Sequence, residues 1–296
     1  MLNLHAGGWG PPKTGKTHIG LSARSHEVRL PGKKSDVAFA KPEPGEVVIP
    51  SKALTIAFAN FDRPADTVFD EIPRDYDIVE ERFFEDEHGE QIWVPDDATV
   101  LDLLRRLQRF VTEAAGEVDL FLLDGATVIW ENVRQVRLGA PAGKDPDGLP
   151  HHLPRQYGEA NAEMRMTVMQ LLYAADFHSW ITLEAGEKWD KASGPVMDPF
   201  GNPVLRLDGW NKTGHYCDVL GQTRFVEKRD GQGNMHWVRE YIPGPGSIKA
   251  QMIGQVIEAP TFADIYRRAF PNVPLLRRED REEYARLLAK HGDLLW

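Results

Sequence analysis

The segment that most constrains this chain runs from Gly10 to Thr17 and reads Gly-Pro-Pro-Lys-Thr-Gly-Lys-Thr, a complete G-x-x-x-x-G-K-S/T pattern. A triphosphate presents crowded negative oxygens, and only closely approaching backbone N–H groups can surround them. Gly10 and Gly15 allow that approach because they adopt backbone conformations that a Cβ atom would obstruct. The pattern therefore predicts a phosphate-binding loop, with a Gly/Pro-rich surface turn as the alternative.

The charged and hydroxyl positions of this loop have separate roles. Lys16 can reach the β and γ phosphates, and Thr17 can ligate Mg²⁺. The helix that starts near Gly15 directs the positive end of its dipole at the anion. The expected ligands are therefore ATP and Mg²⁺. The predicted nucleotide contacts are Gly10, Pro11, Pro12, Lys13, Thr14, Gly15, Lys16, Thr17 and His18.

The sequence on either side of the loop fits a strand before it and a helix after it. Residues 2–6 alternate between apolar and polar, as a half-buried strand does. Residues 17–23 can form a helix even though Gly20 lowers its helix propensity. A strand, a phosphate loop and a helix in this order are the context that the motif requires.

A second diagnostic segment, residues 118–124, is an apolar strand that ends in Asp124. This is the Walker B pattern, in which the terminal carboxylate reaches the Mg²⁺ shell, so Thr17 and Asp124 are the predicted metal residues. In the AAA+ class a catalytic glutamate follows this aspartate directly, whereas here Gly125 follows it. The acid that activates the attacking water is therefore expected elsewhere in the chain.

Two other strands supply acidic residues at their carboxyl ends. Residues 54–61 form a nearly continuous apolar run followed by Asp62, which could orient and activate water. The alternative role for Asp62 is a turn or helix-capping acid. Residues 177–183 form another strand, and Glu184 at its end is a candidate γ-phosphate sensor. Asp62, Lys16 and Glu184 are thus the predicted catalytic residues.

The rest of the chain alternates between strands, helices and turns, and it predicts an α/β fold with a mostly parallel central sheet flanked by helices. Turn signals predict a β-hairpin at residues 27–50, a further strand or hairpin at 75–95, and a pair of strands at 218–227 and 236–242. Residues 1–250 are expected to form the core, and residues 251–296 a carboxyl-terminal helical extension. The expected helices after the first span residues 98–115, 127–138, 157–175, 261–270 and 278–295.

Residues 185–216 form a long irregular segment in which aromatic and cationic residues are interleaved with Gly and Pro. Aromatic rings that stack on bases, together with cations that bind phosphates, are what a single-strand-binding loop needs. The alternative is an ordered lid or β-structure that buries the aromatic residues. The candidate DNA contacts are Lys188, Trp189, Lys191, Arg206, Trp210 and Lys212.

Composition limits the class of protein. The formal net charge is −10, which argues against a surface that is basic throughout but leaves a local basic groove possible. No run of eighteen apolar residues and no signal-peptide pattern occurs, so a protein of the cytoplasm without a membrane partner is expected.

With the Gly10–Thr17 loop, the strand that ends before Asp62 and the strand that ends in Asp124, the chain resembles the RecA-like P-loop ATPases. More narrowly, it resembles phage-type AAA-domain nucleotide-binding proteins, a group that includes single-strand annealing recombinases. The resemblance implies a homo-oligomer with ATP between subunits, DNA-contacting loops at 139–156 and 185–216, and the host cytoplasm as location. It also implies single-stranded DNA as partner, with a single-strand binding protein or replication protein as a further one.

Two other functions remain open from the sequence. A P-loop kinase would need an arginine-bearing lid, for which residues 185–216 are richer in Gly, Pro and aromatics than in arginine. A non-enzymatic nucleotide switch or assembly factor would use residues 27–50 and the terminal helix to contact a protein partner.

Overall fold

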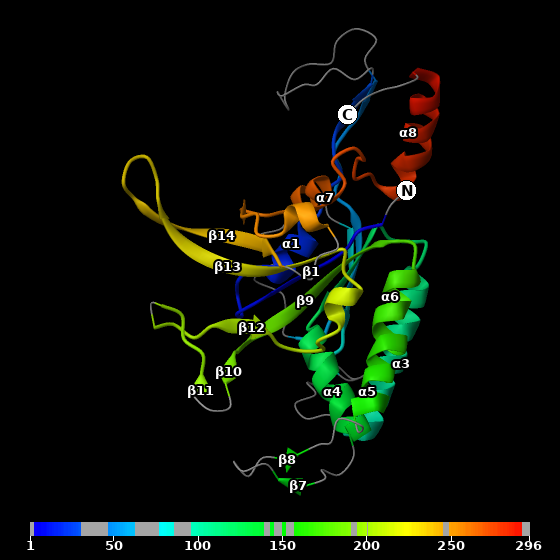
Figure 1. Ribbon diagram of the computed structural model, residues 1–296. Coiled ribbons are helices and arrows are strands. Elements are labelled where there is room, and N and C mark those ends of the chain that lie inside the picture. The colour runs from blue at the N-terminus through cyan, green and yellow to red at the C-terminus, as the bar shows by residue number, and fades with distance from the viewer. Residues whose placement is uncertain are drawn as a thin grey trace.

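The apolar strands of the sequence assemble into one mostly parallel sheet, seen in the computed structural model of the chain (Figure 1). The structure describes residues 3–30, 47–62, 77–85, 96–138, 143–144, 150–151, 157–190, 194–199, 201–244 and 249–291. The strand order is β15-β14-β13-β1-β9-β6-β4-β5, and β12 pairs with the end of β9. The strands are β1 (His5–Gly10), β4 (Thr55–Asn60), β5 (Asp77–Arg82), β6 (Leu120–Asp124), β9 (His178–Glu187), β12 (Leu205–Leu207), β13 (Val219–Arg229), β14 (Met235–Pro243) and β15 (Ile257–Glu258).

Within this sheet the six strands from β13 to β5 are parallel, and of its described strands β14, β15 and β12 run antiparallel to their neighbours. Because parallel strands are covered on both faces, their side chains can be apolar throughout. In β6, Phe121 and Leu123 enter one core cluster, while Leu120 and Leu122 enter the other. The prediction of an α/β fold with a mostly parallel sheet is confirmed.

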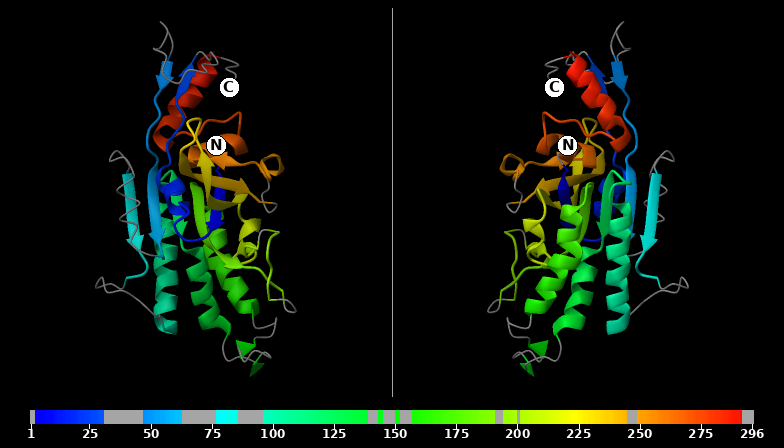
Figure 2. Two further views of the ribbon diagram at one scale, coloured as in Figure 1. Left: turned by 90° about the vertical axis from the view of Figure 1, so that its left-hand side faces the viewer. Right: turned by 90° about the vertical axis from the view of Figure 1, so that its right-hand side faces the viewer.

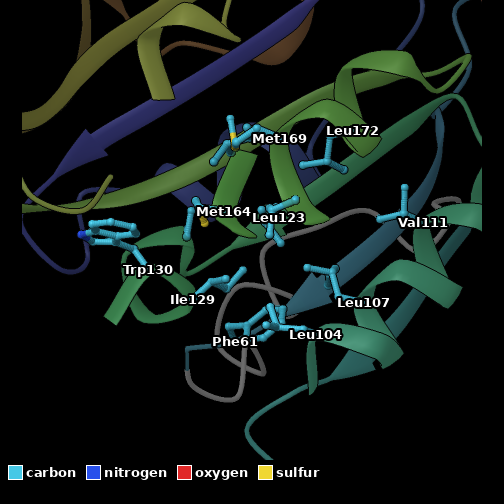
Figure 3. Packing of buried hydrophobic residues seen from close by; sticks show 14 of the residues in the cluster. Phe61, Leu104, Leu107, Val111, Leu123, Ile129, Trp130, Met164, Met169 and Leu172 are labelled. Carbon is cyan, nitrogen blue, oxygen red and sulfur yellow. The ribbon is translucent and has the colours of Figure 1, made fainter. Parts of the chain in front are cut away.

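Four helical segments cover one face of the sheet (Figure 1). They are α3 (Asp97–Ala114), α4 (Ala126–Leu138), α5 (Tyr157–Glu163) and α6 (Gln170–Ala174), and a π-helical segment (Met164–Met169) joins α5 to α6. Figure 3 shows Leu104, Leu107 and Val111 of α3 packing toward the same core as Met164 and Met169. These two methionines are buried and fill this core. Met166 on the same segment is exposed and does not.

Two short helices, α1 (Lys16–Leu21) and α7 (Phe262–Ala269), pack in the cluster on the opposite face. Helix α1 comes so close to the sheet that a Cβ atom on Gly20 would lie 2.2 Å from Leu122 Cδ1. The glycine that weakens the helix in isolation is therefore required by close packing. Helix α7 begins with a capping box between Thr261 and Asp264.

A smaller cluster joins the carboxyl-terminal helix to the predicted hairpin at 27–50. Strands β2 (Val28–Leu30) and β3 (Val47–Ile49) pair antiparallel, as predicted, and α8 (Arg278–His291) packs beside them (Figure 2). The cluster contains Val28, Ile49, Leu276 and Tyr284. Residues 31–46 of this hairpin lie outside the described residues. So do residues 75–76 and 86–95 of the strand or hairpin expected at 75–95, whose described strand, β5, joins the edge of the main sheet.

The structure differs from two expectations about the segment after β6. Strand β9 does not end at Glu184 but continues to Glu187, where it pairs with β12. Residues 185–216 are also less irregular than expected, because they contain β10 (Trp189–Asp190), β11 (Gly194–Pro195), β12 and a short 3₁₀ turn. Of the expected loop at 139–156, only the paired strands β7 (Gly143–Lys144) and β8 (Pro150–His151) are described.

The packing of α1 predicts that Gly20→Ala lowers the free energy of unfolding by about 1–3 kcal/mol, because the new methyl group overpacks the contact with Leu122. Gly158→Ala in α5 is the matched control, since no atom lies within 4 Å of the added Cβ. The control should leave stability unchanged or raise it by up to about 1 kcal/mol. Urea unfolding of both variants measures the difference, and equal effects would contradict the close approach.

Candidate functional site

The loop between β1 and α1 has the backbone conformation of an anion-binding nest. Lys13 and Gly15, two residues apart, have φ angles of 62° and 82°, both in the left-handed region. Left-handed residues within a tight turn direct successive peptide N–H groups toward one point, where an anion can bind. Lys13 is one of only two non-glycine residues with positive φ in the described part of the chain. Backbone strain of this kind concentrates at ligand sites.

Neighbouring strands hold the loop in this shape. Thr14 is buried, and its hydroxyl donates to the carbonyl of Pro11 at 2.8 Å. The same hydroxyl lies 2.8 Å from the Thr223 hydroxyl on β13. On the other side, the indole N–H of Trp180 on β9 donates to the carbonyl of Lys16 at 2.9 Å. Both strands that flank β1 therefore bond to the loop or to the start of α1.

The Lys16 ammonium group folds back over its own loop. Its Nζ donates to the carbonyls of Gly10 and Pro11, each at 2.9 Å. Burial lowers the pKa of Lys16, and the negative charges of Asp124, Glu184 and Asp62 oppose that shift. All three predicted acids thus act electrostatically on the loop lysine, although they come from three different segments of the sequence.

The carboxylate of Asp124 is the most constrained group of the site. Thr17 of the loop donates a hydrogen bond to it at 3.0 Å, and Thr182 of β9 donates to its other oxygen. Burial raises the pKa of Asp124 to about 6 and the charge of Asp62 adds to this, whereas the two hydroxyls and Lys16 oppose it. The predicted metal pair, Thr17 and Asp124, is therefore in direct contact.

Asp62 lies two residues beyond the end of β4 and is exposed. The buried amide of Asn60 accepts a hydrogen bond from the Asp62 backbone N–H at 3.2 Å and donates to Glu80 of β5 at 2.9 Å. Asn60 is also directly opposite Asp124 in the parallel register. Asn60 thus positions Asp62 beside Asp124 while the Asp62 side chain remains accessible to water.

Glu184 is partly buried and lies opposite Gly10, the last residue of β1. Its backbone N–H donates to the Thr127 hydroxyl at 3.0 Å, and that hydroxyl donates to the carbonyl of Asp208 at 2.9 Å. The pairing with β1 therefore fixes the register of Glu184 in the sheet, and the hydrogen bond to Thr127 of α4 holds its backbone.

The other predicted nucleotide contacts surround this centre. Pro12 and Lys13 are exposed at the top of the loop, and His18 is half-buried in α1. Among the described residues, no group of three or more His, Cys, Asp or Glu side chains could hold a metal by itself. The hydroxyl and carboxylate of Thr17 and Asp124 fit Mg²⁺, which binds one or two protein oxygens together with water and substrate phosphates.

One of the predicted DNA contacts is wrong. Trp210 has 1% of its surface exposed and its indole N–H donates to Asn161 at 2.7 Å. Its ring stacks on Tyr216, with ring centroids 5.8 Å apart. This tryptophan belongs to the core, as the alternative interpretation of residues 185–216 proposed, because its hydrogen bond and its ring contacts are all satisfied within the protein.

The remaining candidates differ in position. Trp189 is 63% exposed on the short ribbon of β10 and β11. Lys191 lies outside the described residues. The exposed cations of this region are Lys188, Arg206 and Lys212.

Sequence reasoning missed six residues that shape the site. They are Asn60, Thr127, Trp180, Thr182, Thr223 and Arg239. Thr182 had only a weak signal, because it is a polar residue two positions before Glu184 in a strand that also contains His178 and Ser179. Arg239 had none, since nothing in a charged strand indicates that its guanidinium group lies against Gly15, where a Cβ atom would come within 2.0 Å of its Nε.

Comparison of the chain with protein-family models gave no match, and comparison with curated proteins also gave none. Within the described part of the chain, none of the helices combines the length and apolar composition that a membrane crossing requires.

The raised pKa of Asp124 predicts a pH-dependent effect of Asp124→Asn in the nucleotide-free protein. The folded carboxyl titrates near pH 6 and an unfolded one near pH 4, so the fold loses stability as pH rises between these values. The amide variant avoids this loss, which is on the order of 3 kcal/mol at most. We expect urea unfolding to show that the stability of the variant relative to wild type is higher at pH 7.5 than at pH 4.5. If the difference in free energy of unfolding between variant and wild type is the same at both pH values, burial of the charged carboxylate does not destabilise the fold.

Proposed function

We propose that this chain is a Mg²⁺-dependent ATPase of the RecA-like type that acts with single-stranded DNA in recombination, annealing or replication. The observation that carries the ATPase part is the convergence on one loop of Lys16, Thr17, Asp124, Asp62 and Glu184, which come from four separate segments of the sequence. A surface turn that binds no ligand does not require a buried carboxylate and two further acids around a lysine.

The RecA-like assignment rests on where the acids lie. The mostly parallel sheet, with the loop at the carboxyl end of β1, is compatible with a P-loop core. Gly125 follows Asp124, so the carboxylate that activates water has to come from another strand. Asp62 follows β4, which is directly paired with β6, and this is the place that the RecA-like arrangement favours.

In this proposal each residue acts on a defined part of the nucleotide. The turned backbone of the loop and Lys16 bind the β and γ phosphates, and Thr17 and Asp124 hold the metal. Mg²⁺ supplies positive charge that neutralises the phosphate oxygens. The exposed carboxylate of Asp62 orients a water molecule and accepts its proton, and Glu184 lies at the same end of the sheet.

Strand β9 supports the link to single-stranded DNA. It carries Thr182 and Glu184 at the candidate nucleotide site and continues without a break to Glu187, two residues before the exposed ring of Trp189. A bound base at this ribbon would thus be connected to the nucleotide site by one rigid strand. The ring and the nearby cations Lys188 and Arg206 are the groups that single strands bind through stacking and charge.

The ATPase proposal predicts that Lys16→Ala removes ATP binding, whereas Asp62→Asn retains binding and lowers turnover by at least about 100-fold. Mg²⁺-dependent phosphate release and ATP affinity are measured for both variants and wild type. Unchanged turnover in Asp62→Asn would remove this residue from the mechanism. Tight binding without turnover in the wild type, with or without DNA, would instead favour the nucleotide switch.

The DNA proposal predicts that Trp189→Ala weakens binding of an oligo-dT strand by about 5- to 100-fold, as the loss of one base stack does. Met197→Ala is the matched control, because it removes an exposed apolar side chain from the same segment without removing a ring. Fluorescence anisotropy at low and moderate salt measures both, together with stimulation of ATP hydrolysis by the strand. Equal affinities of the two variants would rule out Trp189 as a stacking residue.

A further inference from the structure

The hairpin of β13 and β14 projects from the body of the protein (Figure 1) and presents one face of side chains that begins at the phosphate loop. Directly paired residues of antiparallel strands share a face, as do alternate residues along each strand. Thr223, whose hydroxyl contacts Thr14, therefore lies on the same face as Phe225, Trp237 and Arg239. Outward from the loop, this face carries Thr223 first, then the directly paired Phe225 and Arg239, and then Trp237.

Arg239 brings a cation onto the loop. A Cβ atom placed on Gly15 would lie 2.0 Å from Nε and 2.4 Å from Cζ of Arg239, so the guanidinium group rests directly against the loop glycine. Its Cζ also lies 5.7 Å from the centroid of the Phe225 ring, which is paired with it across the hairpin. Arginine presents five donors in a planar fork that matches phosphate oxygens.

Two exposed aromatic rings adjoin this arginine. Phe225 is 40% exposed and Trp237 is 68% exposed. They are diagonal neighbours on the hairpin, a distance that aromatic side chains can bridge. A large ring with two thirds of its surface in water next to a candidate nucleotide site offers a stacking surface for a flat, apolar ring.

The position of the acids gives the direction of the nucleotide. Asp124 is the last residue of β6, Asp62 follows β4, and Glu184 lies on β9, so all three are on one side of β1 in the sheet order. The terminal phosphate and the metal belong at that side. The other end of the nucleotide, with its ribose and base, then leads toward β13 and β14 on the opposite side of β1.

We propose that the hairpin completes the nucleotide site, with Arg239 binding the phosphates and the face of Phe225 and Trp237 holding the base. This inference rests on the proposed function and specifies its substrate as a nucleotide that binds through its base as well as its phosphates. The occupant of the aromatic face is the nucleotide itself, because that face is continuous with the phosphate loop through Arg239 and Thr223.

The test compares the affinities of ATP and inorganic tripolyphosphate, both with Mg²⁺, by calorimetry. Replacing Phe225 and Trp237 together by alanine should weaken ATP binding about tenfold or more and leave tripolyphosphate unchanged, since only ATP has a base. Arg239→Gln should weaken both ligands about tenfold, and Arg239→Lys should restore part of each loss. Arg229→Gln, nearer the hairpin tip, is the control for the lost charge and should change neither affinity.

The outcomes separate this inference from the one on which it rests. If wild type binds ATP in a Lys16-dependent manner while the hairpin variants bind both ligands as wild type does, the hairpin has no part in the site and the proposed function stands. Equal losses for both ligands in the aromatic variant would overturn the base contact and retain only Arg239. If wild type binds neither ligand, the nucleotide site itself is refuted.

Discussion

The arrangement of the site depends on the buried carboxylate of Asp124, which accepts hydrogen bonds from two threonine hydroxyls. Thr17 reaches it from the loop and Thr182 from β9, so one side chain ties three segments of the chain together. Burial disfavours the charge, and the two donors compensate for only part of that effect, which is why the pKa remains raised, at about 6. A group held at such a free-energy cost is well suited to bind a cation.

The parallel register extends this constraint across the sheet. Asn60 lies opposite Asp124, and Glu184 lies opposite Gly10, so the acids and the loop meet at the same edge of three neighbouring strands and β1. Each acid has a different environment. Asp124 is buried and bonded, Glu184 is partly buried, and Asp62 is exposed. In the proposed function these environments suit different tasks, because the buried acid would bind the metal and the exposed acid would act on water.

Much of the architecture followed from local patterns. The apolar runs at 54–61 and 118–124 and the mixed segment at 177–183 form buried parallel strands, because the inner strands of a parallel sheet are covered on both faces. Patterns failed where a residue's role depends on a distant neighbour. Trp210 is of a residue type that stacks on DNA bases, yet its hydrogen bond to Asn161 places it in the core. Glu184 is a polar residue after the predicted strand at 177–183 and therefore suggested a strand end, whereas pairing with β12 extends the strand past it.

By itself, the sequence determined the phosphate-loop motif, the α/β alternation and the identities of three acids, because each is encoded in a short, contiguous pattern. The tertiary structure alone decided that those acids converge on Lys16, that Thr182 bonds to Asp124, and that Arg239 lies against Gly15. These contacts join residues that are between 46 and 224 positions apart in the chain. Their distances are set by strand order and register, which depend on the packing of the entire sheet and not on any local segment.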